Sequence, residues 1–323
     1  MQAPATGGRK HGHARKKEKM GESMQNVHRY PTDDEAKKMI VEIGRRMYAK
    51  NFVAANDGNI SCKVDDDLIW TTPTGVSKGF MTEDMMVKMR LDGTVISQGE
   101  KGPSSEVKMH LRIYNENPEV CGVCHAHPPI STSFAIAGLG LDKAIYPEAL
   151  VNLGTVPCVH YEAPGSQGIP DSIAPYCRDY NALLLANHGA VAWGPSLIDA
   201  WYRLESTEHY AMVIMYTGNI IGKANVLSCD QVSELIKIRE KMGITSGGVP
   251  ACTARATNTV DVVAGHSPVT EEPPKLKTFG SQSSCGCGGG SAAIDDAELQ
   301  AITQAVLARR KTIRCFLIFL GRA

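Results

Sequence analysis

Hydrophobic residues recur at helical spacing in four stretches of the chain. Side chains three or four positions apart share one face of a helix, so each stretch predicts a helix with one buried side. Typical helix starts precede them, including an acidic capping sequence, a Pro-Ser-Ser-Glu segment and a Gly-Pro pair. The predicted helices include 39–48, 107–114, 196–217 and 231–242.

Shorter stretches between these helices have the character of strands. Residues 182–186 are continuously apolar, which is typical of a strand covered on both faces. An apolar run at 120–123 leads into a pair of histidines, and further strands are expected within 68–75 and 156–161. This mixture predicts an α/β domain over 31–250, built on a mainly antiparallel central sheet.

The two ends of the chain have a different character from the middle. Residues 1–30 are basic and lack periodicity, so we expect them to be disordered, and 251–293 are rich in the residues of a flexible linker. Residues 294–311 predict a short amphipathic helix with an acidic start and a basic end, as the helix dipole favours. Residues 312–323 are apolar, and no role is assigned to them.

Composition narrows the class of protein. The chain is 43% hydrophobic and 21% charged, which is typical of soluble globular proteins. Its formal net charge is zero, so no overall field favours a nucleic acid as partner. No stretch resembles a signal peptide or approaches the ~20 apolar residues of a membrane span. We therefore expect a cytoplasmic protein whose 10 cysteines are mostly free thiols.

Two histidines in the segment Cys121-Gly-Val-Cys-His-Ala-His-Pro-Pro129 form the first candidate site. Side chains alternate between the faces of a strand, so His125 and His127 point the same way. The two prolines end the strand and leave the pair at its rim, where a substrate can reach a metal. The alternative is a polar strand end that happens to hold two histidines.

A catalytic zinc ion typically takes three protein ligands. His188 is the best third candidate, because it ends the apolar strand and the following Gly189 lets backbone and ligand approach closely. Glu106 is a candidate fourth ligand or base. Its alternative role is an acidic residue that complements the dipole of the helix after it.

Three turns contain groups that bind oxyanions. Ser104 and Ser105 supply hydroxyls and amides at a helix start. The pairs Thr74-Gly75 and Gly58-Asn59 supply turn amides and short polar side chains. Such turns are common, so each is a weak indication by itself.

Taken in order, these motifs resemble the class II aldolase and adducin family, and most closely its L-fuculose-phosphate aldolases. The resemblance covers about 35–245 and implies a three-layer α/β domain with helices covering the sheet. The matching segments are GNIS at 58–61, TPTG at 72–75, PSSE at 103–106, HAH at 125–127, PCVHY at 157–161 and NHG at 187–189.

The resemblance implies a zinc ion on His125, His127 and His188. Glu106 would be the fourth ligand at rest and the acid/base that exchanges a proton of dihydroxyacetone phosphate. Zinc would stabilise the charge left by retro-aldol cleavage as a Lewis acid, and the neighbouring carboxylate could move the proton. The substrate phosphate would be held by Asn59, Thr74, Gly75, Ser104 and Ser105.

The aldehyde side of the implied site departs from the family pattern. Tyr146 matches the family tyrosine that protonates the departing aldehyde oxygen, and Glu148 is an alternative acid/base. A tyrosine near the family's C-terminus aligns with Met242, and an aromatic residue in the loop after 157–161 is replaced by Pro164. The identity of the aldehyde is therefore less secure than the zinc chemistry.

The implied activity is zinc-dependent cleavage of a ketose 1-phosphate, L-fuculose 1-phosphate in the first instance, to dihydroxyacetone phosphate and lactaldehyde. Alternatives on the same fold are a pentulose-5-phosphate 4-epimerase and an aldolase for rhamnulose 1-phosphate or another deoxyketose phosphate. A non-catalytic, adducin-like binding module is the alternative of another class.

The resemblance also implies partners. Family members assemble as tetramers, so we expect a homotetramer. Residues 294–311 resemble the encapsulation peptides that recruit enzymes into bacterial microcompartments. This resemblance implies shell or cargo proteins as partners and a location inside a microcompartment of the cytoplasm.

Overall fold

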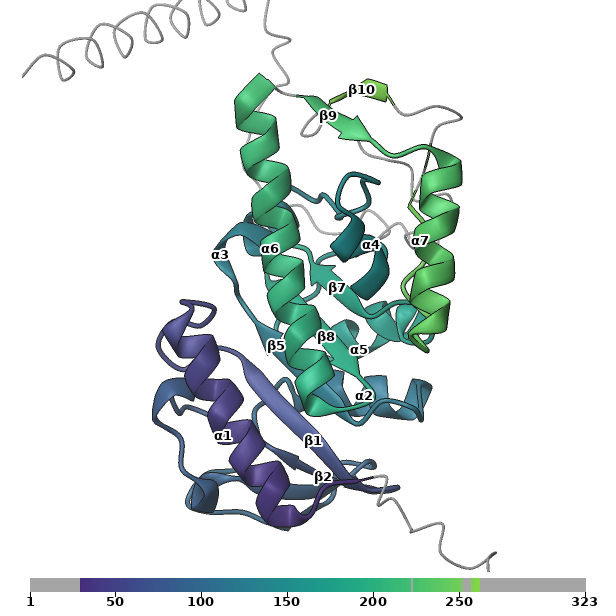
Figure 1. Ribbon diagram of the computed structural model, residues 1–323. Helices are drawn as coiled ribbons and strands as arrows, with labels where there is room; N and C mark the ends of the chain where they lie inside the picture. Colours follow the sequence, from purple (N-terminus) through teal and green to yellow (C-terminus); the bar gives the residue numbers. More distant parts are fainter. Residues whose placement is uncertain (1–29, 222, 251, 253–256, 262–323) are drawn as a thin grey trace, which may run out of the picture. The chain divides into compact units, whose positions relative to one another are not determined.

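The computed structural model describes residues 30–221, 223–250, 252 and 257–261 (Figure 1). The chain divides into two units, 1–271 and 272–323, and the second lies wholly outside the described residues. The predictions for the N-terminal extension, the helix at 294–311 and the apolar tail therefore lie outside the described residues, apart from residue 30. The linker predicted at 251–293 is described only at 252 and 257–261, and 257–261 form a strand, β10, where the composition indicated a flexible segment.

An eight-stranded sheet forms the centre of the first unit, in the order β4-β3-β2-β1-β5-β8-β7-β6. Every pair of neighbours is antiparallel except β6 and β7, which confirms the mainly antiparallel prediction. The strands are β1 (Asn59–Asp65), β2 (Leu68–Thr71), β3 (Val87–Arg90), β4 (Val95–Ser97), β5 (Gly122–Ala126), β6 (Cys158–Val159), β7 (Ala182–Leu185) and β8 (Gly189–Gly194). The strand expected within 156–161 is only two residues long.

All four predicted helices are present, and short ones accompany them. The prolines after the histidine pair do more than end a strand, because Pro129 is also the first residue of a helix, where a missing N–H costs nothing. The helices are α1 (Asp33–Ala49), α2 (Val107–Glu116), α3 (Pro129–Ile136), α4 (Pro147–Asn152), α5 (Gly168–Ile173), α6 (Leu197–Ile221) and α7 (Cys229–Lys241). Three 3-10 turns, Lys78–Phe80, Glu83–Met85 and Ala174–Tyr176, and a separate pair of strands, β9 (Lys223–Val226) and β10 (Thr257–Asp261), complete the described elements.

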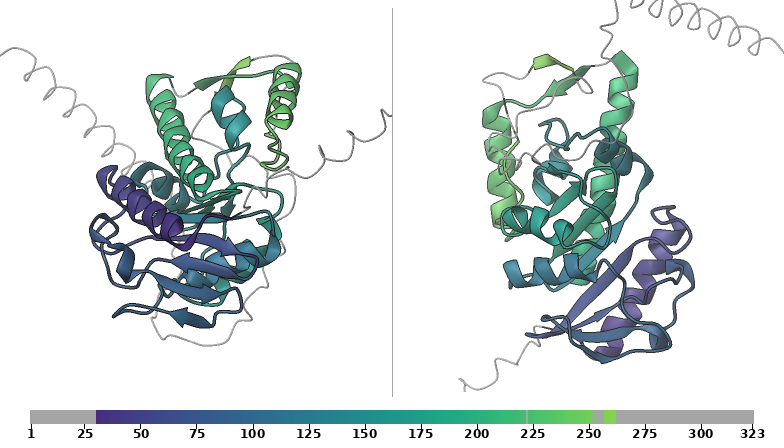
Figure 2. Two further views of the ribbon diagram at one scale, coloured as in Figure 1. Left: turned by 60° about the horizontal axis from the view of Figure 1, so that its bottom comes forward. Right: turned by 180° about the vertical axis from the view of Figure 1, so that it is seen from behind.

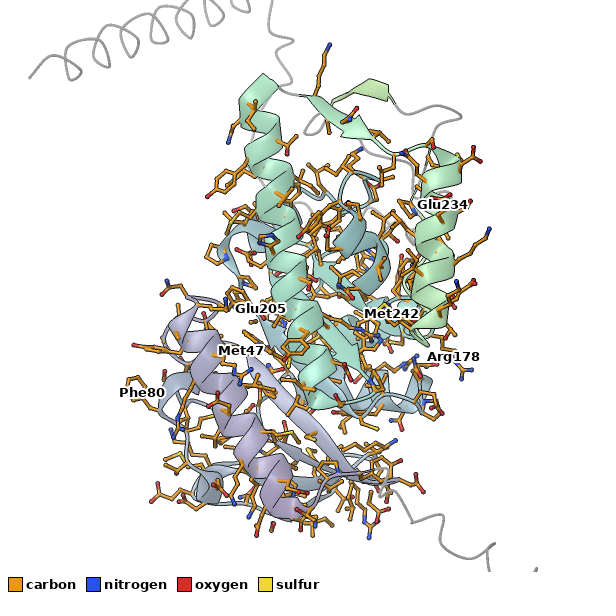
Figure 3. The ribbon with its side chains drawn as sticks, in the orientation of Figure 1. Met47, Phe80, Arg178, Glu205, Glu234 and Met242 are labelled. Carbon is orange, nitrogen blue, oxygen red and sulfur yellow. A yellow bond between two sulfur atoms is a disulfide. The ribbon has the colours of Figure 1, made fainter. Side chains whose placement is uncertain are left out.

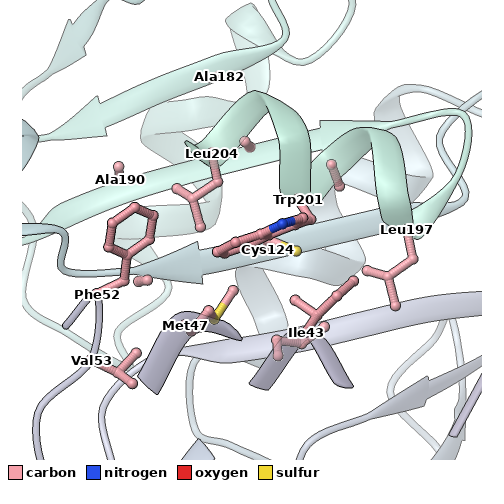
Figure 4. Close-up of a cluster of buried hydrophobic side chains, with 14 of the residues drawn as sticks. Ile43, Met47, Phe52, Val53, Cys124, Ala182, Ala190, Leu197, Trp201 and Leu204 are labelled. Carbon is pink, nitrogen blue, oxygen red and sulfur yellow. The ribbon is translucent and has the colours of Figure 1, made fainter. Parts of the chain in front are cut away.

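Helices cover both faces of the sheet, which makes three layers. On one face, α1 and α6 pack through residues such as Met47, Trp201 and Leu204 (Figures 1 and 4). On the other face, α2 and α5 pack through residues such as Ile113 and Ile173 (Figure 2, right). Each face removes a continuous apolar surface from water, and this burial is the main stabilising contribution to the fold.

The strand that carries the histidine pair alternates between these layers. Cys124 and Ala126 of β5 belong to the cluster under α1 and α6, whereas Val123 belongs to the cluster under α2. His125 therefore points to the α2 face, as the two-residue period of a strand requires. This alternation decides on which side of the sheet the site is built.

The cysteines are only partly as predicted. Cys62, Cys121, Cys124, Cys158 and Cys177 are free thiols, but Cys229 and Cys252 form a disulfide. The spacing of these two cysteines gave no sign of a pair, because only the chain path after α7 brings them together. Among the described residues, none of the helices is long and apolar enough to cross a membrane.

Candidate metal centre

Three histidines meet at one end of β5 and β8. His125 lies in β5, His127 follows that strand, and His188 lies in the tight turn that joins β7 to β8. Gly189 is needed at this crossing, because a Cβ there would lie 2.6 Å from the carbonyl oxygen of Ala126 and from Cδ2 of His127. The neighbouring strands β5 and β8 thus bring together residues that are far apart in the sequence.

The three imidazoles face a common point. Their possible ligand atoms all lie within 4.8 Å of one another. The ring centroids are 5.1 Å apart for His125 and His127, 4.8 Å for His125 and His188, and 5.0 Å for His127 and His188. His125 is fully buried, while the His127 side chain is 26% exposed and faces the rim. The cluster is therefore anchored in the core and open on one side.

Glu106 completes the cluster from the opposite direction. Its Oε1 lies 3.0 Å from Nε2 of His188, and its Oε2 lies 3.4 Å from Nε2 of His125. Burial by itself raises the pKa of this carboxyl, but the charges and hydrogen bonds of the two histidines outweigh it and hold the pKa far below its usual range. Glu106 is thus a carboxylate at neutral pH. It occupies the N-cap position of α2, but its side chain makes no capping hydrogen bond.

Backing contacts orient two of the imidazoles. Nδ1 of His125 lies 2.9 Å from the carbonyl oxygen of Ala190, and Nδ1 of His127 lies 3.4 Å from a carboxylate oxygen of Asp57. Such partners fix the ring orientation and leave Nε2 for a cation. Burial, followed by repulsion from His125 and His188, lowers the pKa of His127 to about 4, so this ring is neutral at pH 7. Asp57 was not predicted from the sequence, where it reads only as a turn residue.

The donor set fits a divalent cation. The Nε2 atom of His127 is buried and no described residue offers it a hydrogen bond, and the Nε2 atom of His125 is buried 3.4 Å from the Glu106 carboxylate. Buried polar atoms without partners are costly, and a cation that accepts their lone pairs removes this cost. Three imidazole nitrogens and one carboxylate are ligands that Zn²⁺ takes in tetrahedral sites.

The turns expected to hold a phosphate lie beside one another. Pro73 and Pro103 form an isolated antiparallel bridge. It joins the turn at Thr74-Gly75 to the segment at Ser104-Ser105, with Gly75 at a positive φ of 64°. The amides of Thr74 and Ser104 are occupied, since they donate to the carbonyls of Gly102 and Thr72 respectively. The hydroxyls and the remaining groups of these turns are what an anion would meet.

The third phosphate-binding candidate, Asn59, bridges these turns and the metal centre. Its Nδ2 lies 2.9 Å from Oε2 of Glu106 and 3.4 Å from Oγ of Ser104. Asn59 also pairs with His125 across β1 and β5. Because Asn59 touches both groups, it couples the phosphate turns to the carboxylate.

Lys78 is a charged residue near these turns that the sequence pattern did not reveal. It is fully buried, and its ammonium donates to the carbonyls of Asn56 at 2.9 Å and Val76 at 2.7 Å. Burial lowers its pKa to about 8, although the charges of Asp57 and Glu106 oppose that shift. Lys78 thus ties the two loops that flank the phosphate turns.

Tyr146 and Glu148 lie apart from the histidines. The Tyr146 ring packs against His209 and Tyr210 of α6. Tyr146, Glu148 and Met242 line a cavity of about 930 Å³ along α6, and none of the three histidines is among its described lining residues. Met242, at the end of α7, is exposed (Figure 3). Three of the four positions assigned to the aldehyde side therefore share one cavity, and Pro164 is not among its described lining residues.

Comparisons with known proteins identify the family of the chain. The model of the family described as "Class II Aldolase and Adducin N-terminal domain" matches residues 38–215. The chain is 33% identical over 208 residues to the 3-oxo-tetronate 4-phosphate decarboxylase of Pectobacterium atrosepticum, covering 63% of this chain and 94% of the relative. It is 35% identical over 180 residues to the L-fuculose phosphate aldolase of Methanocaldococcus jannaschii, covering 55% and 95%. A solved L-fuculose 1-phosphate aldolase is similar with a TM-score of 0.59 and 27% identity, covering 67% and 99%.

Proposed function

The chain belongs to the class II aldolase and adducin N-terminal domain family, and we propose that it is a zinc-dependent aldolase acting on a ketose 1-phosphate. The proposed first substrate is L-fuculose 1-phosphate, and the products are dihydroxyacetone phosphate and lactaldehyde. The observation that carries the proposal is the Glu106 carboxylate, held 3.0 and 3.4 Å from the Nε2 atoms of two clustered imidazoles.

The residues of the site divide the chemistry between them. His125, His127, His188 and Glu106 would hold Zn²⁺, which when bound supplies Lewis-acid stabilisation of the charge that develops as the carbon–carbon bond breaks. In cleavage, the hydroxyl that becomes the aldehyde oxygen loses a proton and the hydroxymethyl carbon of dihydroxyacetone phosphate gains one. Glu106, an anionic carboxylate at rest, would take up a proton during the reaction and deliver it to that carbon, and in condensation it would remove it. The substrate phosphate would be held by Asn59, Thr74, Gly75, Ser104 and Ser105.

We propose a homotetramer in which Tyr146 of one copy serves the metal centre of another as the acid/base at the aldehyde oxygen, which loses a proton in cleavage and gains one in condensation. This arrangement is supported by the position of Tyr146, which lines the α6 cavity rather than contacting its own histidines. Glu148 lines the same cavity and is the alternative acid/base. Met242, in place of the family tyrosine, lies there as well, so the pocket for the aldehyde would have a changed wall.

A substrate panel tests the activity. Zinc-loaded protein is expected to release dihydroxyacetone phosphate and lactaldehyde from L-fuculose 1-phosphate faster than it releases products from rhamnulose 1-phosphate. The panel includes 3-oxo-tetronate 4-phosphate, since a relative named for its decarboxylation is 33% identical, and ribulose 5-phosphate for an epimerase. Metal content is measured on the same sample. Release of carbon dioxide, or epimerisation without cleavage, would replace the aldolase proposal with that activity.

The alternative of a non-catalytic binding module predicts a different result. An adducin-like binding module has no need of a ligand set, and the clustering of three histidines with Glu106 argues for the enzyme. Absence of bound metal and of turnover on every substrate would favour the binding module instead.

We further propose that residues 294–311 direct the enzyme into a bacterial microcompartment. The support is the sequence resemblance of this segment to encapsulation peptides, with a stripe of Leu299, Ile302 and Val306. Deletion of 290–323 is expected to leave turnover in solution unchanged and to abolish co-localisation with a shell. Co-localisation that survives the deletion would contradict the proposal.

A further inference from the structure

Polar side chains of α2 and β1 interlock behind the metal centre. Glu106, His110 and Tyr114 recur every four residues, so they share one face of α2. Asn59 and Ser61 are two positions apart in β1, so their side chains lie on the same face of the strand, the face toward α2. Five residues, Asn59, Ser61, Glu106, His110 and Tyr114, form this polar seam, which the apolar pattern of the sequence does not predict.

Short hydrogen bonds join the two elements along the seam. Oγ of Ser61 lies 2.7 Å from Nδ1 of His110 and 2.8 Å from the hydroxyl of Tyr114. One turn earlier, Asn59 donates to Glu106 at 2.9 Å. Ser61, His110 and Tyr114 are all essentially inaccessible to water, so each of these bonds satisfies a group that could not otherwise be buried without cost.

The two titratable groups that bond to Ser61 are uncharged. Burial raises the pKa of Tyr114 well above its usual value and, followed by the charge of His125, lowers the pKa of His110 to about 3. Both groups are therefore neutral. The Ser61 hydroxyl can both donate and accept, so it can bond to the neutral imidazole and to the phenol at once.

The seam is the means by which α2 is placed relative to the histidines. β1 pairs with β5 so that Asn59 lies opposite His125 and Ser61 opposite Val123. The start of α2 has no side-chain cap, so the hydrogen bonds of the seam, together with the apolar contacts of the helix, set its rotation and height. Moving α2 would carry the Glu106 carboxylate away from the Nε2 atoms of His125 and His188.

We propose that Ser61, His110 and Tyr114 are positioning residues for Glu106, and that His110 acts through its Nδ1 contact with Ser61. The inference rests on the proposed function, in which Glu106 is both a zinc ligand and the acid/base. Among the described residues, none of these three makes a hydrogen bond to His125, His127 or His188. Their effect therefore passes through the backbone of α2.

Two substitutions of one residue separate this role from a general packing role. The amide of His110→Asn lies near the former Nδ1 and keeps the contact with Ser61, whereas that of His110→Gln lies near the former Nε2 and loses it. Ser61→Ala removes the hydroxyl with little change in volume. Ile113→Val is the matched control, because Ile113 is buried on α2 but lies outside the seam.

Two quantities are measured for each variant. The first is zinc affinity, by competition with a chelator. The second is the rate at which a hydroxymethyl proton of dihydroxyacetone phosphate exchanges with deuterium when no aldehyde is present. Ser61→Ala and His110→Gln are expected to lower both by about tenfold, the lower end of the range for groups that hydrogen-bond a metal ligand directly, because these residues act one contact further away, and KM should change little. His110→Asn and Ile113→Val are expected to stay within about threefold of wild type, since neither breaks the hydrogen bonds of the seam. Melting temperatures confirm that each variant is folded.

The outcomes separate the inference from the proposed function. Wild-type values in Ser61→Ala and His110→Gln would overturn the inference and leave the aldolase proposal standing, and so would an equal loss in Ile113→Val. A wild-type protein that binds zinc but cleaves no ketose phosphate would overturn the proposed function, and the zinc-affinity comparison would still decide the inference. A wild-type protein without zinc affinity would overturn both.

Discussion

His125→Ala is expected to remove the bound metal and the cleavage activity together. His125 is the fully buried member of the cluster, and its Nε2 lies 3.4 Å from Oε2 of Glu106. Its loss leaves two imidazoles and deprives the Glu106 carboxylate of one of its two neighbours. Removing a direct ligand should exceed the cost of removing an outer-shell partner, so zinc affinity and activity should fall by more than about 100-fold.

Metal analysis of the purified variant and turnover with added zinc measure the two effects. His160→Ala is a matched control, because His160 is exposed and pairs with Glu162 outside the cluster. It should retain wild-type metal content. A metal-loaded and fully active His125→Ala protein would show that the centre has been assigned to the wrong residues.

Glu106→Gln is expected to separate metal binding from proton transfer. Glutamine has the shape of glutamate and can still accept from Asn59, but it cannot take up a proton at neutral pH. The low pKa of Glu106 means that the wild-type residue is already the anionic base at pH 7. Loss of a general acid/base typically costs about 10²- to 10⁴-fold, so kcat and deuterium exchange should fall by that factor while KM stays similar.

The assay is run at saturating zinc, because the three histidines left in Glu106→Gln are expected to bind zinc more weakly than the wild-type site. Glu116→Gln is the control on the same helix, where the carboxylate pairs with Arg112 near the surface. It should behave like wild type. Exchange at the wild-type rate in Glu106→Gln, with zinc bound, would assign the proton transfer to another residue, and Glu148 would be the first candidate.

The elements of the fold were predictable where one local pattern dominated. The cap and apolar spacing before Met47 indicate α1, which has a capping box between Thr32 and Glu35. The continuous apolar run at 182–186 indicates a strand covered on both faces, and β7 is fully buried. Short elements were missed, because a helix such as α3 or α5 has too few turns to establish a period.

Inside α2, the apolar pattern was right about the helix and incomplete about its buried face. The spacing predicts Val107, Leu111 and Tyr114 as the buried side, but Leu111 is only half-buried. His110 and Ile113 are fully buried instead. A polar residue at a buried position looks like a surface residue in a hydrophobicity pattern, so the seam with Ser61 appears only when the partner strand is known.

The candidate site was predictable to the extent that its motifs are local. The alternation of a strand indicates that His125 and His127 share a face, and the order of the motifs suggested His188 and Glu106 as their partners. Neither pattern could supply the contacts of Lys78, the Asp57 carboxylate behind His127, or the disulfide of Cys229. These depend on where distant loops meet, and the sequence carries no direct record of such meetings.

The sequence by itself determined the long helices and strands and the shared face of the histidine pair, because each depends on residues within a few positions of one another. It also determined the family resemblance, because each of the short motifs that carry it is local and their order is read directly from the chain. Only the tertiary structure decided that Glu106 stands between His125 and His188, that β1 and α2 are joined by buried polar groups, and that Tyr146 lines a cavity apart from its own histidines. The physical reason is that distances between remote segments are set by the packing of the whole sheet against its helices, and no local period contains that information.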